Sequence, residues 1–132
     1  MTDVWTLYEE LGAEPRASLT EVEREVFAIC DLRQEVNAGG FENYFRSWGG
    51  GTAAEALDAL PGVLGQSWVD LLSEALALLG PEYPADANDR SDLLDDAELE
   101  GRLQVLDDRF YGLEESVDAD AKMSAYLAHE SE

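Results

Sequence analysis

Two adjacent glycines, Gly39 and Gly40, constrain the fold of this chain most, because they separate two segments that both have helical patterns. Glycine adopts the left-handed conformation that ends many helices without the steric penalty of a Cβ atom. Asn37, just upstream, can bond nearby backbone groups through its side chain. The sequence therefore predicts a helix that ends at the glycines, a corner, and a second helix after it.

Aromatic residues mark the helix that follows this corner. Phe41, Tyr44, Phe45 and Trp48 stand at positions i, i+3, i+4 and i+7, which places all four on one face. We interpret them as anchors in the core rather than as a ligand-binding corner, because no polar groups converge on the same stretch.

Helical signals recur along the rest of the chain. Thr20 with Glu23 and Thr52 with Glu55 have the spacing of a capping box, which predicts two helix starts. Together with apolar periodicity, these signals predict helices at residues 3–12, 20–38, 52–60, 66–79, 91–111 and 119–129. Residues 49–51 are expected to be a flexible break, residues 61–62 the end of a helix, and residues 66–79 the central helix.

Arg33 lies near the middle of the apolar face of the helix predicted at residues 20–38. An unpaired charge in that position would be costly. We therefore expect its guanidinium to pair with a carboxylate or to bond a backbone carbonyl.

These patterns predict an all-α fold, with residues 1–132 forming a single domain of six or seven helices. No stretch alternates apolar and polar residues for long enough to indicate a strand. A chain of this length forms one domain and buries about two-thirds of its unfolded surface. Phe41, Phe45, Trp68, Leu72 and Phe110 are expected to share one core.

The corner also carries a family resemblance. The stretch Asn37-Ala38-Gly39-Gly40-Phe41-Glu42-Asn43-Tyr44-Phe45 resembles the N-G-G-F-x-Q-Y-F signature of the bacterial DNA-mimic protein family, from which Ala38 and Asn43 depart. Residues 53–60 resemble the alanine-rich helix that follows the signature, and residues 106–111 resemble a late L-D-x-x-F-Y element. The resemblance covers about residues 19–129 and implies a small acidic helical protein. Its structural signature positions are Asn37, Gly39, Gly40, Phe41, Tyr44 and Phe45.

The charge of the chain is strongly unbalanced. Thirty acidic residues oppose eight basic ones, which gives a net charge of −22 at pH 7. Residues 82–132 hold 16 acidic and 4 basic residues, whereas the longer segment 1–81 holds 14 and 4. Such a chain is repelled by nucleic acid and by anionic membranes, and it is attracted to basic protein surfaces.

Residues suited to catalysis or to metal binding are scarce. The chain has one cysteine, Cys30, and one histidine, His129, whereas a structural zinc site takes four such ligands. The segment that begins at Asp86 fails as a calcium loop, because Arg90 stands where a ligand belongs. Residues 49–51 lack the Lys-Ser/Thr that completes a phosphate-binding loop. We therefore predict no enzymatic activity, no metal and no cofactor.

A group of carboxylates in the last third of the chain is the predicted partner-binding surface. On the helix predicted at residues 91–111, Asp92, Asp96 and Glu100 recur every four residues, about 5–6 Å apart. The full surface comprises Asp92, Asp95, Asp96, Glu100, Asp107, Asp108, Glu114, Glu115, Asp118 and Asp120. Behind it runs an apolar seam of Leu99, Leu103, Leu106 and Phe110, which is expected to fix the acidic face to the core.

The acidic surface and the resemblance together predict a protein-interaction module. We expect a DNA mimic that occupies the basic surface of a nucleic-acid-binding protein, such as a DNA-binding regulator. An immunity protein or antitoxin that neutralises a cationic toxin, such as a nuclease, would use the same electrostatics, and the identity of the partner separates the two. A domain from a salt-adapted cell, with no mimic role, is the third interpretation.

The expected location is the cytoplasm. The N-terminal residues M-T-D-V-W lack the basic and apolar regions of a signal peptide. No segment reaches the roughly 18 apolar residues of a membrane span. A single cysteine cannot form an intrachain disulfide, so nothing indicates an oxidising compartment.

The net charge predicts that added salt stabilises the fold. Screening weakens the repulsion among the carboxylates, with a Debye length of about 10 Å at 0.1 M salt. The melting temperature, followed by circular dichroism, should rise between low salt and about 0.5 M. A flat or falling melting temperature would contradict this.

Overall fold

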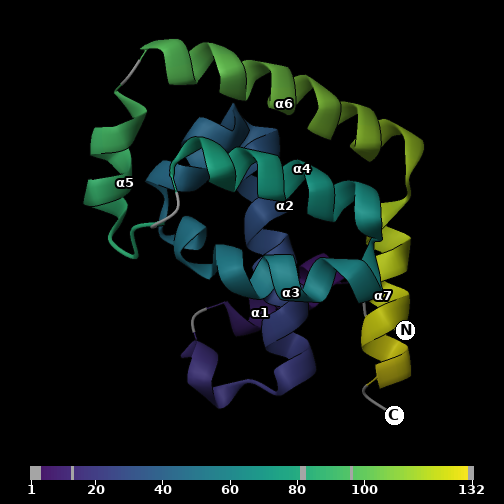
Figure 1. Cartoon of the computed structure of the whole chain (residues 1–132). Coiled ribbons are helices and arrows are strands. Elements are labelled where there is room, and N and C mark those ends of the chain that lie inside the picture. The colour runs from purple at the N-terminus through teal and green to yellow at the C-terminus, as the bar shows by residue number, and fades with distance from the viewer. Residues whose placement is uncertain (1–3, 13, 81–82, 96, 131–132) are drawn as a thin grey trace.

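The computed structural model describes residues 4–12, 14–80, 83–95 and 97–130, in which it contains seven α-helices and no strand (Figure 1). The helices are α1 (Val4–Leu11), α2 (Glu21–Arg46), α3 (Ala53–Val63), α4 (Gln66–Leu78), α5 (Ala87–Leu94), α6 (Ala97–Ser116) and α7 (Ala119–Glu130). Two short 3-10 turns, η1 (Arg16–Ser18) and η2 (Trp48–Thr52), complete the described structure. The predicted all-α fold is confirmed.

The long helix α2 is the centre of the molecule. It contacts α1, α3, α5, α6 and α7, and it runs through the middle of the fold in Figure 1. The prediction that residues 66–79 form the central helix is wrong. That segment is α4, which is buried on one face through Trp68, Leu71 and Leu72 and has its main contacts with α3 and α6.

One of the two predicted capping boxes is present. The Glu23 amide donates to Thr20 Oγ1 at 3.1 Å, and the Thr20 amide donates to Glu23 Oε1 at 2.8 Å. The second box is wrong. The Thr52 side chain makes no capping bond to α3, and its hydroxyl donates instead to Asp31 Oδ2 at 2.9 Å.

The aromatic helix ends earlier than its periodicity indicates. Helix α2 ends at Arg46, and Ser47 is extended, so Trp48 leaves the buried face and is 67% exposed. The prediction that Trp48 anchors the core is therefore wrong. The glycines that follow, which are expected to be a flexible break, lie in the 3-10 turn η2. A Cβ atom on Gly50 would lie 2.5 Å from the Tyr44 carbonyl oxygen, so this turn packs directly on α2.

Residues 61–62 do not end a helix, contrary to the prediction. Helix α3 continues through Pro61 to Val63, because Leu60 and Val63 are buried and hold the last turn against the core. The helix ends at Val63, and the chain turns at Gly65, which has a φ of 109°. Its amide and that of Leu64 both donate to the Leu60 carbonyl, at 2.8 and 2.9 Å.

The single helix predicted at residues 91–111 is also wrong, because two helices share this segment. Asp86 caps α5 by accepting a bond from the Asn88 amide at 2.7 Å, and α5 ends at Leu94. Arg90 is only 1% exposed, and it donates to the carbonyls of Phe45, Ser47, Pro84 and Ala85. These bonds hold α5 against the end of α2, so the chain must turn before α6 (Figure 1).

The predicted core is confirmed. Phe41, Phe45, Trp68, Leu72 and Phe110 all belong to one buried apolar cluster. Phe110 packs edge to face on Phe41 at 5.7 Å between ring centroids, and on Trp68 at 5.3 Å. Because Phe110 comes from α6, these contacts fix α6 to both α2 and α4. The seam behind the acidic face is present too, with Leu103 and Leu106 buried and Leu99 partly buried.

The predicted glycine corner is present as a break inside α2. Gly39 and Gly40 have non-helical backbone angles, and Gly40 has a φ of 80°, which favours glycine. Such a break leaves amides and carbonyls without partners inside the helix.

Residues of α6 and α2 satisfy these backbone groups. Asp107 Oδ1 accepts a bond from the Phe41 amide at 2.8 Å, and the Tyr111 hydroxyl donates to the Val36 carbonyl at 3.1 Å. Asn43 Nδ2 donates to the Glu35 carbonyl at 2.9 Å. The segment around the glycine signature and the late element at residues 106–111 are therefore hydrogen-bonded to each other.

Replacing Gly40 by alanine should destabilise the protein. The new Cβ would lie 2.4 Å from Asp107 Oδ2, in a backbone conformation that alanine rarely adopts. We expect a loss of about 2–3 kcal/mol of unfolding free energy from backbone strain and a weakened cap. Urea unfolding measures this loss.

Gly101→Ala is the matched control for this variant. A Cβ atom at Gly101 meets nothing within 4 Å, and the residue lies inside α6. This variant should gain about 0.5–1 kcal/mol from helix propensity. Equal effects of the two substitutions would rule out the proposed contact.

Candidate partner-binding surface

Asp107 lies on the inner side of the acidic helix. It is half-buried, and its carboxylate is bonded to the amide that follows the glycine corner. Burial raises the pKa of this carboxyl, and the bond from Phe41 opposes that rise. Asp107 is therefore a structural cap in this fold, although the sequence places it in the partner-binding surface.

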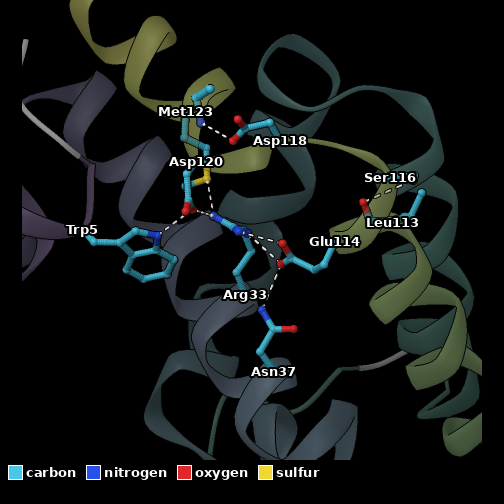
Figure 2. A network of polar contacts seen from close by, with 10 residues as sticks. Trp5, Arg33, Asn37, Leu113, Glu114, Ser116, Asp118, Asp120 and Met123 are labelled. Carbon is cyan, nitrogen blue, oxygen red and sulfur yellow. Dashed lines mark hydrogen bonds and ion pairs between the residues drawn. The ribbon is translucent and has the colours of Figure 1, made fainter.

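Arg33 binds two more of the predicted surface residues. Its Nε and Nη2 donate to the two carboxylate oxygens of Glu114 at 2.8 and 2.7 Å, and its Nη1 donates to Asp120 Oδ1 at 2.6 Å (Figure 2). Trp5 Nε1 also donates to Asp120, and the guanidinium lies 5.4 Å from the Trp5 ring centroid. The predicted pairing of Arg33 is confirmed, and it ties α2 to α1, α6 and α7.

The protonation of this cluster follows from its geometry. Burial lowers the pKa of Arg33, but hydrogen bonds to Glu114 and Asp120 outweigh burial and raise it. Partial burial raises the pKa of Asp120, but bonds from Arg33 and Trp5 outweigh it, so the net change is downward. The geometry therefore favours the ionised forms of Arg33 and Asp120.

Two further residues have local structural roles. Asn37 was expected to bond nearby backbone groups, but its Nδ2 donates to Glu114 Oε2 at 2.9 Å and so supports the Arg33 cluster. Asp118 is exposed, and its side chain accepts a bond from the Ala121 amide at 3.0 Å in the first turn of α7.

The remaining predicted residues that the structure describes are exposed. Those that make no hydrogen bond or ion pair with any described residue are Asp92, Glu100, Asp108 and Glu115. Asp95 is also exposed, and it lies 3.3 Å from a guanidinium nitrogen of Arg46. Asp96 lies outside the described residues. The structure thus leaves five described carboxylates of the predicted surface open to solvent with at most one surface ion pair.

The regular row predicted for Asp92, Asp96 and Glu100 is not present on one helix. Asp92 belongs to α5 and Glu100 to α6, which follow different directions in Figure 1. On α6 itself, Glu100 and Asp108 are eight residues apart, which corresponds to about 12 Å along the helix axis. This exceeds the roughly 3.4 Å between phosphates on one DNA strand. These two carboxylates therefore reproduce the sign of the DNA potential but not the phosphate spacing.

The basic residues all lie in the described ranges, and most of them are buried or paired with carboxylates of the same chain. Arg33 and Arg90 are buried, and Arg16 forms a bidentate pair with buried Asp31 at 2.9 and 3.0 Å. The surface pairs are Arg46 with Glu42 and Asp95, Arg102 with Glu98, and Arg109 with Glu74. Little positive charge therefore remains to offset the exposed carboxylates.

Sequence reasoning missed two exposed residues beside this surface. Asp89 lies on α5, and it was missed because the helix was expected to begin at Ser91. Asp86 could have indicated the earlier helix start, because aspartate is a preferred N-cap residue. Trp48 was assigned to the core, and only the extended conformation of Ser47 places it outside.

The described residues offer few groups for chemistry. Cys30 is fully buried, and burial raises the pKa of its thiol, which disfavours the reactive thiolate. In the described ranges, no three His, Cys, Asp or Glu side chains gather as a potential metal site. Among those same residues, no helix is long and apolar enough to cross a membrane.

Comparison with known protein families finds a match for most of the chain. A family model described as DMP19-like protein matches residues 17–130. The chain therefore belongs to the DMP19-like protein family, and the resemblance to DNA-mimic proteins seen at about residues 19–129 is confirmed. No curated protein and no solved structure matches the chain.

Arg33→Met should destabilise the protein by about 2–4 kcal/mol. Removing one member of a buried ion pair leaves the other charge without compensation. The expected destabilisation is smaller than for a fully buried pair, because the Asp120 side chain is 52% exposed. Arg24→Met is the matched control, because Arg24 is exposed and, among the described residues, bonds only the Leu19 carbonyl. Both variants change the net charge equally, so chemical unfolding separates pairing from charge. Equal destabilisation would contradict the role of the cluster.

The same cluster predicts a pH effect on stability. Because the pKa of Asp120 is lowered in the folded state, its contribution is present above the ordinary carboxyl pKa of about 4 and is lost as pH falls through the lowered value. Between about pH 4 and pH 2, Arg33→Met should therefore lose less stability than the parent protein. Parallel pH profiles of unfolding free energy would refute this coupling.

Proposed function

We propose that this chain is a DNA mimic that acts by binding and not by catalysis. Its partner is a basic protein whose nucleic-acid-binding surface receives the exposed carboxylates of α5 and α6. Membership of the DMP19-like family supports this role, and the net charge of −22 supports a basic partner.

One observation carries the proposal. On α5 and α6 the carboxylates of Asp92, Glu100, Asp108 and Glu115 are exposed and lack partners among the described residues, whereas the buried guanidiniums of Arg33 and Arg90 sit inside the fold. On α6 the exposed Arg102 and Arg109 are both paired with carboxylates, so little unpaired positive charge remains on this face. An uncompensated negative surface accelerates and orients encounter with a basic protein.

The scaffold favours binding because it holds these carboxylates in place. The inner face of α6 is fixed by Leu103, Leu106 and Phe110 in the core, and by the bonds that Asp107 and Tyr111 make to the broken helix α2. A disordered acidic tail would lose more conformational entropy when it binds. A preformed acidic face avoids that loss.

The test neutralises three carboxylates of the surface and three elsewhere. The surface variant carries Asp92→Asn, Glu100→Gln and Asp108→Asn. The control carries Glu9→Gln, Glu10→Gln and Glu14→Gln, which are exposed carboxylates on and just after α1. Partners are captured from native lysate at low salt, eluted by a salt step and identified, and their affinity for each variant is then measured.

The surface variant should bind the captured basic protein at least about tenfold more weakly at low salt, because each lost contact removes part of a strong electrostatic attraction. The control should bind within about twofold of the parent protein. Equal weakening by both variants would show that only total charge matters. Unchanged binding by the surface variant would show that these carboxylates serve solvation.

A further inference from the structure

Trp48 is displayed on the surface by the turn η2, which is bonded to neighbouring segments. Its side chain is 67% exposed, whereas the Trp68 side chain is 2% exposed in the core. The turn that carries it is held on two sides, because Arg90 donates to the Ser47 carbonyl at 3.0 Å and the Tyr83 hydroxyl donates to the Gly50 carbonyl at 2.5 Å. A large aromatic side chain held outside the core in this way is typical of an anchor in a protein interface.

A small pocket lies beside this indole. It has a volume of about 260 Å³, and its walls include Trp48, Thr52 and Glu55 together with the start of α5. Two arginines, Arg16 and Arg90, also line it. The pocket is therefore bounded by an aromatic ring, one exposed carboxylate and two guanidiniums.

The two arginines are already engaged and do not make this an anion site. Arg16 forms its bidentate pair with Asp31, and its guanidinium lies 4.9 Å from the Trp48 ring centroid. Arg90 is 1% exposed, with its nitrogens bonded to backbone carbonyls. Glu55 is exposed and makes no hydrogen bond or ion pair with a described residue. The open ionic group of the pocket is therefore negative.

We propose that this pocket receives an arginine side chain of the basic partner, and this inference rests on the proposed function. The guanidinium would lie against the exposed surface of Trp48 and pair with Glu55. Arginine fits because its planar cation both stacks on aromatic rings and pairs with carboxylates. Exposed carboxylates also stand at the start of α5, which lines the pocket, in Asp86 at its N-cap and Asp89 in its first turn.

The experiment uses a hexa-arginine peptide as the probe and the full chain as the receptor. Indole N–H signals in ¹H–¹⁵N spectra report Trp5, Trp48 and Trp68 separately, and loss of a signal in Trp48→Ala assigns that residue. Peptide affinity is measured for the parent chain, Trp48→Ala, Glu55→Gln and the control Glu9→Gln, which removes the same charge from an exposed site on α1. Thermal melts confirm that each variant is folded.

The proposal predicts a saturable shift of the Trp48 signal, with those of Trp5 and Trp68 unchanged. Trp48→Ala and Glu55→Gln should each weaken peptide binding about threefold to tenfold, the range of a partly desolvated cation–π contact or ion pair. Glu9→Gln should leave the affinity within about twofold of the parent value. Should Trp48→Ala fail to fold, Glu55→Gln and the Trp48 signal of the parent chain still decide the test.

Three results would overturn the inference. If the amides of α5 and α6 shift while the Trp48 signal stays fixed, the pocket is not used, but the proposed function stands. If neither shifts, both proposals fail. If the Trp48 signal moves with protein concentration in the absence of peptide, a second copy of this chain occupies the site.

Discussion

The bond between the Asp107 carboxylate and the Phe41 amide joins α6 to the break in α2, and the rest of the fold depends on this contact. Helix α2 is broken at Gly39 and Gly40, and a break leaves backbone groups that must find other partners. Helix α6 supplies a carboxylate for the freed amide and the Tyr111 hydroxyl for the Val36 carbonyl. Because the same helix carries exposed carboxylates on its outer side, the contact that completes α2 also orients the acidic surface.

A second constraint is the placement of charge along α2. Asp31 and Arg33 are both buried, and each gathers partners from distant parts of the chain. Asp31 accepts bonds from Tyr8, Arg16 and Thr52, while Arg33 binds Glu114 and Asp120. Satisfying buried charges in this way is obligatory once they leave water. Most cations are therefore buried or paired with carboxylates, and the charge exposed on the surface is mostly negative.

The sequence predicted those features that depend on local pattern. The helical class, the glycine corner, the first capping box and the aromatic core follow from spacing and from the conformational freedom of glycine. Features that depend on contacts between distant residues could not be predicted from local sequence pattern. Ser47 turns Trp48 out of the core, Arg90 binds α5 against the end of α2, and the cap supplied by Asp107 becomes visible only when α6 lies on α2. Of the predicted surface, the exposed carboxylates remain candidates for binding, whereas Asp107, Glu114 and Asp120 have structural partners.

The central claim is that the acidic surface occupies the place of DNA on a basic protein, and competition tests it most directly. The captured partner is bound to fluorescently labelled duplex DNA at fixed ionic strength, and this protein or its Asp92→Asn, Glu100→Gln, Asp108→Asn variant is then titrated in. We expect the parent protein to displace the duplex completely and excess duplex to reverse the displacement, whereas the variant should be required at a concentration at least about tenfold higher. A stable ternary complex of partner, duplex and this protein would contradict it.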